Sequence, residues 1–248
     1  ILAWTTTPWT LPANLGVALN PEFDYSFIET DSGDVWVLAD KLKSDVLDIS
    51  GQNVRNVLHT CKGRELEHFL CRHPFYDRDS LIVLGHHVTS EAGTGCVHTA
   101  PGHGMDDYMV GQKYNLAILS PVNEAGVFTD EAPMFEGLYY AKANNIIVDL
   151  LKEKGLLIHH STFVHSYPHC WRTKTPVIYR ATKQWFASLD GFRESALEAV
   201  KQVQWIPAGG EERIGNMIAE RSDWCISRQR VWGVPIPAFY CQETGDAL

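Results

Sequence analysis

The chain gathers its most chemically capable side chains in one short segment, residues 93–108. His98 and His103 can exchange protons near neutral pH, and the adjacent carboxylates of Asp106 and Asp107 can bind a cation. Four glycines in the same segment allow positive backbone φ angles and let a ligand approach the backbone closely. The sequence therefore predicts a binding or catalytic site here, where an expected strand passes through a loop into an expected helix.

Three interpretations of this segment remain open from the residue types alone. The segment could be a tight turn with one aspartate as a helix N-cap, which leaves the second carboxylate without a role. Alternatively, His98, His103 and Asp107 could bind zinc or another divalent cation, as in a metal-dependent hydrolase. We favour the third interpretation, a site for an organic ligand. The glycine spacing fits neither a dinucleotide-binding fingerprint nor a phosphate loop with a Gly-Lys-Ser/Thr sequence.

A second group of polar residues lies near the start of the chain, in the sequence Trp-Thr-Thr-Thr-Pro-Trp-Thr-Leu-Pro-Ala-Asn of residues 4–14. Three consecutive threonines suit a β-strand, in which alternate hydroxyl groups point to opposite faces. Pro8 and Pro12 are expected to keep the path that follows extended and non-helical. A plain edge strand would explain this pattern. A row of hydroxyl groups beside two tryptophans could also form a pocket that accepts only a small side chain, and it could hydrogen-bond an ester.

The elements that must position these residues are mostly short strands. Branched and aromatic residues predict strands, and apolar residues at helical spacing predict helices. The expected strands are residues 1–6, 16–19, 25–29, 35–39, 54–59, 81–88, 95–98, 116–121 and 156–164, and the expected helices are residues 41–49, 105–114 and 144–154. This pattern predicts an α+β fold, with a β-barrel-like core of short, mostly antiparallel strands and peripheral helices.

The pattern of residue types changes near residue 166, and we place a domain boundary there. Residues 1–165 form the first predicted domain, and residues 166–248 form an α/β connecting segment. The first part has 11 Lys and Arg against 21 Asp and Glu, whereas the second has 10 against 9. Any phosphate contact is therefore expected in the second part, within the cationic stretch of residues 172–183.

The composition restricts the class of protein. With 45% hydrophobic and 21% charged residues among 248, the chain can bury a substantial core. No apolar run approaches the roughly 20 residues needed to span a bilayer, so no membrane partner is expected. Six cysteines without a Cys-x-x-Cys pair predict neither a disulfide framework nor a zinc site, which suits a reducing cytoplasm. The net charge of −9 argues against a general nucleic-acid binder.

Both polar segments resemble a known family at their specific residues. Residues 5–14 together with residues 95–108 are similar to the editing insertion of isoleucyl-tRNA synthetases. The likeness continues through residues 165–172, 175–176, 180–182 and 184–186. Residues 223–233 resemble the segment by which that family's chain re-enters its synthetic domain. The resemblance thus runs nearly end to end, and we expect the chain to be part of a longer protein.

The resemblance implies a reaction and its partners. The implied reaction is hydrolysis of valine wrongly esterified to tRNA(Ile), with valine or valyl-adenylate as the small ligand. Editing is expected to need no cofactor, whereas the parent synthetase would use ATP and Mg²⁺. The family's two ATP-handling signatures, His-Ile-Gly-His and Lys-Met-Ser-Lys-Ser, are absent from this sequence, so it is not expected to activate isoleucine. A cytoplasmic monomer is expected.

The resemblance also implies catalytic roles for three residues. Asp107 is expected to bind the α-ammonium group of the substrate in a charge-assisted pair. His98 is expected to lie beside the amino-acid side chain and the terminal ribose, where it helps to exclude isoleucine. Thr7 is expected to contact the ester or the adenosine and to position a water molecule. No Ser or Cys nucleophile is paired with a base in the sequence, so direct attack by water is expected.

Six further positions are carried over as residues that bind or support the substrate. They are Thr5, Thr6, Trp9, Asn14, His103 and Asp106. The two threonines would share the contacts of Thr7, the asparagine would support them, and the tryptophan would form a pocket wall. Asp106 is expected to cap the helix that follows, and His103 to shape the loop. No metal ligand is expected, and a non-catalytic tRNA-binding module, supported only by the cationic stretch, is the remaining alternative.

Overall fold

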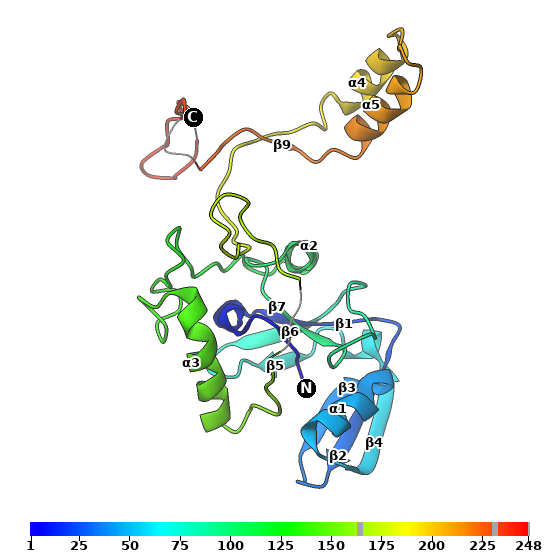
Figure 1. Ribbon diagram of the computed structural model, residues 1–248, viewed down its shortest axis with the longest axis vertical. Coiled ribbons are helices and arrows are strands. Elements are labelled where there is room, and N and C mark those ends of the chain that lie inside the picture. Colours follow the sequence, from blue (N-terminus) through cyan, green and yellow to red (C-terminus); the bar gives the residue numbers. More distant parts are fainter. Residues whose placement is uncertain (163–165, 230–232, 248) are drawn as a thin grey trace. The chain divides into compact units, whose positions relative to one another are not determined.

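The computed structural model describes residues 1–162, 166–229 and 233–247. The chain divides into two compact units, Ile1–Ala181 and Thr182–Leu248 (Figure 1). The first unit holds every residue of the two polar segments, so the candidate site lies within it.

The first unit extends past residue 166, the position of the predicted domain boundary. Residues up to Ala181 belong to it because Ala181 N–H donates a hydrogen bond to Gly102 O at 2.7 Å. The role of residues 166–248 as a connecting segment stays a prediction. His165, the last residue of the first predicted domain, lies outside the described residues.

The first sheet has four strands in the order β5-β6-β1-β7 (Figure 1). In that order the strands are Leu70–Arg72, Asp79–Leu84, Gly16–Leu19 and Cys96–Thr99. β1 runs parallel to β6 and antiparallel to β7. All four residues of β1 are buried, as its apolar sequence Gly-Val-Ala-Leu requires. The register places His98 of β7 opposite Val17, so the sheet carries this histidine into buried surroundings.

The second sheet has three antiparallel strands in the order β3-β2-β4. They are Val35–Ala39, Asp24–Thr30 and Val54–Lys62, and the short helices η2 (Asp40–Leu42), α1 (Lys43–Ser50) and η3 (Gly63–Leu66) adjoin them. A tight turn joins β2 to β3, with Gly33 at φ 87°. Buried Ile28, Trp36 and Leu38 form the local core, against which Val46 and Leu47 of α1 pack.

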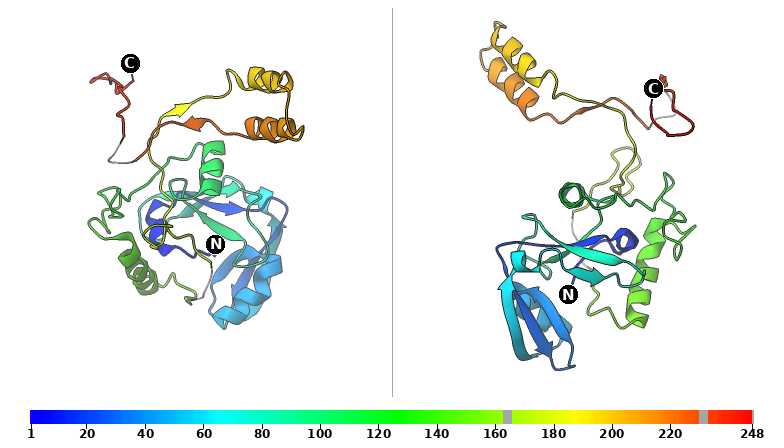
Figure 2. Two further views of the ribbon diagram at one scale, coloured as in Figure 1. Left: turned by 45° about the horizontal axis from the view of Figure 1, so that its top comes forward. Right: turned by 180° about the vertical axis from the view of Figure 1, so that it is seen from behind.

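The two sheets lie side by side at one corner (Figure 2), where backbone hydrogen bonds connect them and the N-terminal residues. Leu2 N–H donates to Val37 O (3.0 Å), Trp4 N–H donates to Cys96 O (3.2 Å), and Ala39 N–H donates to Thr94 O (2.9 Å). The α+β class and the mostly antiparallel pairing agree with the prediction. The barrel-like closure does not: within the described part of the chain the strands form separate sheets, because loop and N-terminal residues rather than a shared strand connect them.

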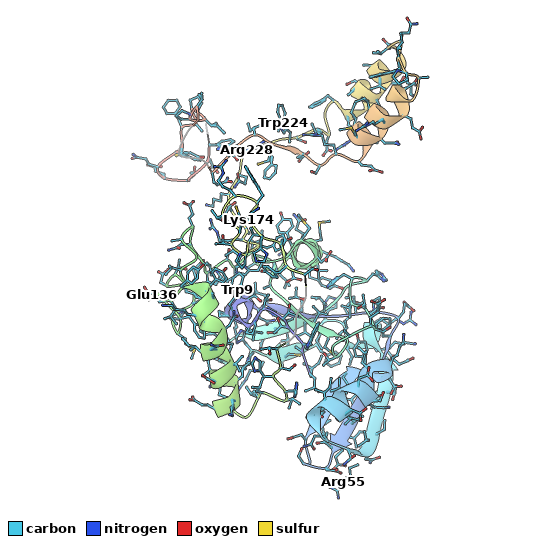
Figure 3. The ribbon with its side chains drawn as sticks, in the orientation of Figure 1. Trp9, Arg55, Glu136, Lys174, Trp224 and Arg228 are labelled. Atoms are coloured by element: carbon cyan, nitrogen blue, oxygen red, sulfur yellow. The ribbon has the colours of Figure 1, made fainter. Side chains whose placement is uncertain are left out.

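Helix α3 (Tyr140–Glu153) packs on the 3₁₀ helix η1 (Pro8–Ala13). The apolar cluster between them is formed by Trp9, Leu11, Val122, Phe128, Ala132, Phe135, Ala143 and Ile147. Figure 3 shows Trp9 on η1 beside the α3 ribbon. The threonine-rich segment (residues 4–14) is therefore anchored in a buried apolar cluster.

The path of this N-terminal segment differs from the prediction. Residues 1–6 form no strand beyond a single bridge from Trp4 to Val97, and η1 replaces the expected extended path. Pro8 occupies the start of η1, where its fixed φ suits a helix and its missing N–H would have no partner anyway. Pro12 interrupts few hydrogen bonds because η1 is only one short 3₁₀ stretch. The rule that proline breaks helices applies to the interior of an α-helix.

The other predicted elements are confirmed in part. The helices expected at residues 41–49, 105–114 and 144–154 are α1, α2 (Met105–Lys113) and α3, although α3 begins at Tyr140. Residues 116–121 form no strand, and only an isolated bridge joins Val122 to Phe128. Residues 156–162 also form no strand, and the end of the strand expected there lies outside the described residues.

The described residues of the second unit form two short strands and two helices. β8 (Phe186–Ala187) pairs antiparallel with β9 (Trp224–Cys225), and α4 (Arg193–Lys201) packs along α5 (Gly210–Ala219). Residues 230–232, part of the last motif, lie outside the described residues. None of the helices in the described ranges has the length and apolarity that a membrane crossing requires.

Gly95 stands at the corner where the two sheets meet. Its φ is +72°, and a Cβ atom there would lie 2.3 Å from Ala39 Cβ. Gly33 has a similar φ of +87°, but a Cβ there would meet nothing within 4 Å. We expect Gly95→Ala to lower the free energy of unfolding by about 3 kcal/mol and Gly33→Ala by about 1 kcal/mol, because only the first adds overpacking to left-handed strain. Urea unfolding measures both losses, and equal losses would contradict the steric role of Gly95.

Candidate active site

Side chains from outside η1 hold this short helix in place. Trp9 N–H donates to Asn144 Oδ1 (2.9 Å), His73 Nε2 donates to Leu11 O (2.9 Å), and Arg78 donates to Pro12 O. A 3₁₀ helix of six residues leaves most of its backbone groups without intrahelical partners. These three side chains satisfy some of those groups and so fix the path of the threonine-rich segment.

His98 is 7% exposed, and both of its ring nitrogens are hydrogen-bonded. Asn14 Nδ2 lies 2.8 Å from the carbonyl oxygen of Gly16, which can only accept, so this end of the amide is the donor. The same Nδ2 donates to His98 Nδ1 at 2.7 Å. Neutral His98 therefore carries its proton on Nε2, which donates to Thr10 Oγ1 at 2.9 Å.

Burial keeps three histidines near η1 uncharged. Burial lowers the pKa of His98 to about 3, and the nearby His103 and His73 add to the shift. Burial also lowers the pKa of His73, to about 4, and that of His103. At pH 7 His98 is thus neutral and has no free lone pair, so it cannot act as a general base. Its predicted role beside the substrate side chain stays a prediction.

The threonine hydroxyl groups continue from His98 as a chain of polar contacts. Thr10 Oγ1 donates to Thr7 O at 2.8 Å, and Thr7 Oγ1 lies 3.4 Å from Thr10 Oγ1. Thr7 N–H donates to Thr5 Oγ1 at 3.1 Å. Thr6 is exposed, and its side chain makes no hydrogen bond within the described residues. The structure thus brings Thr5, Thr7 and Asn14 together with His98, and leaves Thr6 facing outward.

Asp107 lies in the first turn of α2 and is half-buried. Its Oδ2 accepts a hydrogen bond from Ala100 N–H at 2.9 Å, which turns the carboxylate back towards the end of β7. A Cβ at Gly104 would lie 3.2 Å from Asp107 Cγ, so glycine leaves room for this arrangement. Burial raises the pKa of Asp107, although the Ala100 N–H and the nearby His87 oppose the shift. The α2 N-terminus also favours a negative charge here.

Asp106 does not have the capping role that we predict for it. The N-cap of α2 is Gly104, and Asp106 is exposed in the first turn. The prediction was wrong because the helix begins at Met105, so Asp106 lies inside the first turn and not at the N-cap position, where a capping side chain must stand. Asp106 still contributes negative charge near the helix N-terminus.

His103 shapes the loop by contacts with two other segments. Its Nδ1 donates to Tyr179 O at 3.0 Å, so His103 carries its proton on the opposite nitrogen from His98. Its ring meets the edge of Trp9 at a centroid distance of 4.9 Å. His103 Nε2 is buried and has no hydrogen-bond partner within the described part of the chain. His103 and Trp9 are therefore packed together rather than lining open space.

Four residues that hold the site were not predicted from the sequence. They are Thr10, His73, Arg78 and Ser80. Ser80 Oγ donates to Asn14 Oδ1, and His73 receives the backbone N–H groups of Phe75 and Tyr76 on its Nδ1 (3.2 and 3.1 Å). Thr10 lies within the threonine-rich residues 4–14, whereas His73, Arg78 and Ser80 belong to no recognised motif. Their only sequence signal is a polar residue among apolar ones.

The arrangement restricts the chemistry. Among the residues that the structure describes, no three His, Cys, Asp or Glu side chains converge as a metal site. Cys96 is buried beside the site, and burial raises the pKa of its thiol to about 12, so it is no nucleophile. Two cavities of about 470 Å³ lie elsewhere, one between α4 and α5 and one between the two sheets. The cluster is therefore identified by its hydrogen bonds rather than by a cavity.

Comparisons with known proteins give this cluster a family context. Residues 12–248 match the family model of the tRNA synthetases class I (I, L, M and V). The chain is 58% identical to the isoleucine–tRNA ligase of Caldanaerobacter subterraneus subsp. tengcongensis, over 99% of this chain and 26% of that protein. It is 58% identical to that of Brevibacillus brevis, over 100% of this chain and 27% of that protein. The chain thus spans about a quarter of the length of these relatives.

A solved structure supports the fold alone. The crystal structure of GlLeuRS-CP1 matches with a TM-score of 0.52 at 15% identity, over 64% of this chain and 82% of that chain.

The buried histidines make stability depend on pH. An unfolded histidine gains its proton near pH 6.5, whereas folded His98 and His73 gain theirs only near pH 3 and pH 4. Between these values the unfolded state binds more protons, so stability is full above pH 6.5 and falls as the pH drops. We expect the free energy of unfolding to fall by roughly 2–4 kcal/mol from pH 7 to pH 5.

His73→Gln tests this pH dependence, because the glutamine amide can still donate to Leu11 O but does not titrate. The variant should lose about half of the pH dependence, as measured by urea unfolding at both pH values. An undiminished dependence would contradict the assignment of His73 as a neutral donor.

Proposed function

Because this chain belongs to the tRNA synthetases of class I (I, L, M and V), we propose that it is the editing part of an isoleucine–tRNA ligase. In this proposal it hydrolyses the ester that joins valine to tRNA(Ile). The observation that carries the proposal is the carboxylate of Asp107. Oδ2 is held by Ala100 N–H, while Oδ1 accepts no hydrogen bond from the described residues and is available to an ammonium group.

The need for such a reaction is physical. One methylene group is worth only about 1–3 kcal/mol in a hydrophobic pocket, a limit for which isoleucine–tRNA ligases are themselves the known example. A pocket that binds isoleucine for activation therefore also admits valine. A second site can correct the error if it accepts the smaller side chain and excludes the larger one.

The site residues would divide the reaction between them. Asp107 Oδ1 binds the α-ammonium group of valine in a charge-assisted hydrogen bond. Thr7, with Thr5 beside it, places a water molecule against the ester carbonyl carbon. The water oxygen bonds to this carbon, the ester C–O bond breaks, and the tRNA hydroxyl oxygen receives the proton that the attacking water loses, which leaves valine as its carboxylate with release of the second water proton. His98, neutral and fixed, forms the wall that limits the side chain.

The proposal extends to the partners and cofactors of the full-length protein. The partner is tRNA(Ile) carrying valine, with valyl-adenylate as a further possible ligand. Editing uses no cofactor, and ATP with Mg²⁺ serves the ligation reaction in the remaining three quarters of the protein. We place the protein in the cytoplasm as a monomer.

Asp107→Ala should lower the rate of valyl-tRNA(Ile) deacylation at least about 100-fold, because it removes the carboxylate proposed to bind the α-ammonium group. Asp106→Ala is the matched comparison, since Asp106 is the exposed neighbour, and it should reduce the rate less than about threefold. Deacylation of ³H-valyl-tRNA measures both rates, with thermal unfolding as the check on folding. A wild-type rate in Asp107→Ala would overturn the proposed function.

His98→Ala should relax selectivity, because it removes a rigid wall beside the substrate side chain. We expect the ratio of valyl-tRNA to isoleucyl-tRNA deacylation rates to fall about tenfold, the effect of roughly 1.4 kcal/mol. His86→Ala, at an exposed histidine, should leave the ratio as it is. If the ratio in His98→Ala matched the wild type, His98 would have no part in side-chain discrimination.

A further inference from the structure

Thr7 stands at the N-cap position of η1, but its side chain does not cap this helix. The hydroxyl oxygen of an N-cap threonine normally accepts a hydrogen bond from the N–H two or three residues later. The Thr10 N–H, three residues later, donates to the backbone oxygen of Thr7 instead (3.0 Å). The Trp9 N–H, two residues later, donates to Asn144 Oδ1 (2.9 Å). Both N–H groups that could hold Thr7 Oγ1 thus have other partners.

Asn144 takes over the capping of η1 from a distant helix. It lies in α3, 135 residues after Trp9 in the sequence, and is half-buried. The Trp9 N–H can only donate, so the amide oxygen of Asn144 must face it. Trp9 is 4% exposed, and a buried N–H group is costly when it has no partner. The N–H of Trp9 therefore needs an acceptor, and Asn144 supplies it in place of Thr7.

The Thr7 hydroxyl group is left with only long contacts to the other threonines. Within the described residues, Thr7 Oγ1 lies 3.5 Å from Thr5 Oγ1 and 3.4 Å from Thr10 Oγ1. Both distances exceed the roughly 3.0 Å of a good hydrogen bond between hydroxyl groups. The Thr10 hydroxyl proton is directed to Thr7 O, so Thr10 cannot also donate to Thr7 Oγ1. Thr7 is half-buried, and its hydroxyl oxygen can thus accept a hydrogen bond from water.

The alternative conformation for Thr7 is seen one step earlier in the chain. Thr5 Oγ1 accepts a hydrogen bond at 3.1 Å from the N–H of Thr7, two residues later. Threonine commonly forms such a turn with its own backbone. The same spacing separates Thr7 from Trp9. Without the Asn144 oxygen, rotation of Thr7 about χ1 would let its hydroxyl oxygen accept the Trp9 N–H, and the hydroxyl group would then serve the helix.

We propose that Asn144 is a positioning residue for the editing reaction: it caps η1 in place of Thr7 and so keeps the Thr7 hydroxyl group available to the attacking water. The relation to editing rests on the proposed function above. The conformation of Thr7 depends only on the hydrogen bonds of this chain.

The first experiment measures the χ1 rotamer of Thr7 by NMR, from the three-bond couplings of its Cγ2 to the backbone N and C′ in the ¹³C,¹⁵N-labelled chain. The samples are the wild type, Asn144→Ala, Asn144→Asp and Asn145→Ala. Asn144→Asp keeps an acceptor oxygen at the same place, and Asn145 is the exposed neighbour on α3. We expect only Asn144→Ala to change the couplings, because Thr7 then turns to the Trp9 N–H. Unchanged couplings in Asn144→Ala would overturn the proposal.

The ¹H–¹⁵N spectrum of each sample shows whether the variant is folded. If Asn144→Ala were unfolded, Asn144→Leu would replace it, because leucine keeps the volume of asparagine without its acceptor. The expected and overturning results are then the same.

Deacylation of valyl-tRNA(Ile) tests the link to the reaction. In Asn144→Ala we expect kcat to fall about tenfold with KM within twofold, because the hydroxyl group acts on the water rather than on substrate binding. Asn144→Asp and Asn145→Ala should keep kcat within threefold of the wild type. A changed Thr7 rotamer without a fall in kcat would overturn the positioning role.

A double-mutant cycle shows whether Asn144 acts through Thr7. Thr7→Val removes the hydroxyl group and should lower kcat at least as far as Asn144→Ala does. Adding Asn144→Ala to Thr7→Val should then lower kcat less than about twofold, because the group that Asn144 positions is already absent. A further tenfold loss would overturn the proposal. If the wild type itself did not deacylate valyl-tRNA(Ile), the proposed function would fail, while the NMR couplings would still decide how η1 is capped.

Discussion

The hydrogen bonds of His98 join the threonine-rich segment to the first sheet, and the rest of the candidate site depends on that connection. Residues 5–14 have no continuous strand partner, so ladder hydrogen bonds cannot fix their path. The imidazole bridges Thr10, in the middle of η1, and Asn14, the C-cap of η1. β7 also leads through the glycine loop to Asp107. The hydroxyl groups are connected to β7 by His98, and the carboxylate is connected to the end of β7 by Ala100 N–H.

In the candidate site the neutral histidines are more deeply buried than the charged Asp107. The buried histidines lose their charge because no carboxylate compensates for burial, and they serve as directed donors and acceptors. Asp107 is less buried, receives a backbone N–H, and lies at a helix N-terminus, all of which lower the cost of its charge. This anionic group lies beside buried histidines that are neutral, so they do not compete with a cationic substrate group for it.

The sequence was informative where a side chain itself carries the signal. The segments with Thr5, Thr7, Asn14, His98 and Asp107 could be recognised because their residue types are unusual together, and the three helices followed from apolar spacing. The path of the threonine-rich segment could not be predicted. It is determined by His73, Arg78 and Asn144, which are distant in sequence and bind backbone atoms of η1. Every residue type has the same backbone carbonyl group, and all but proline have a backbone N–H. The sequence of η1 therefore does not reveal which of its backbone groups receive these contacts.

The glycine loop, residues 100–104, is likewise held by residues about 80 positions later in the chain. Gly102 O accepts from Ala181 N–H (2.7 Å), and His103 Nδ1 donates to Tyr179 O (3.0 Å). A Cβ at Gly102 would lie 2.1 Å from Leu119 O, so the loop is confined on that side as well. The loop leads directly into α2 and Asp107, and the chain passes into the second unit one residue after Ala181. Residues 179–181 therefore hold the loop that leads into α2 and Asp107, although they are distant from it in sequence.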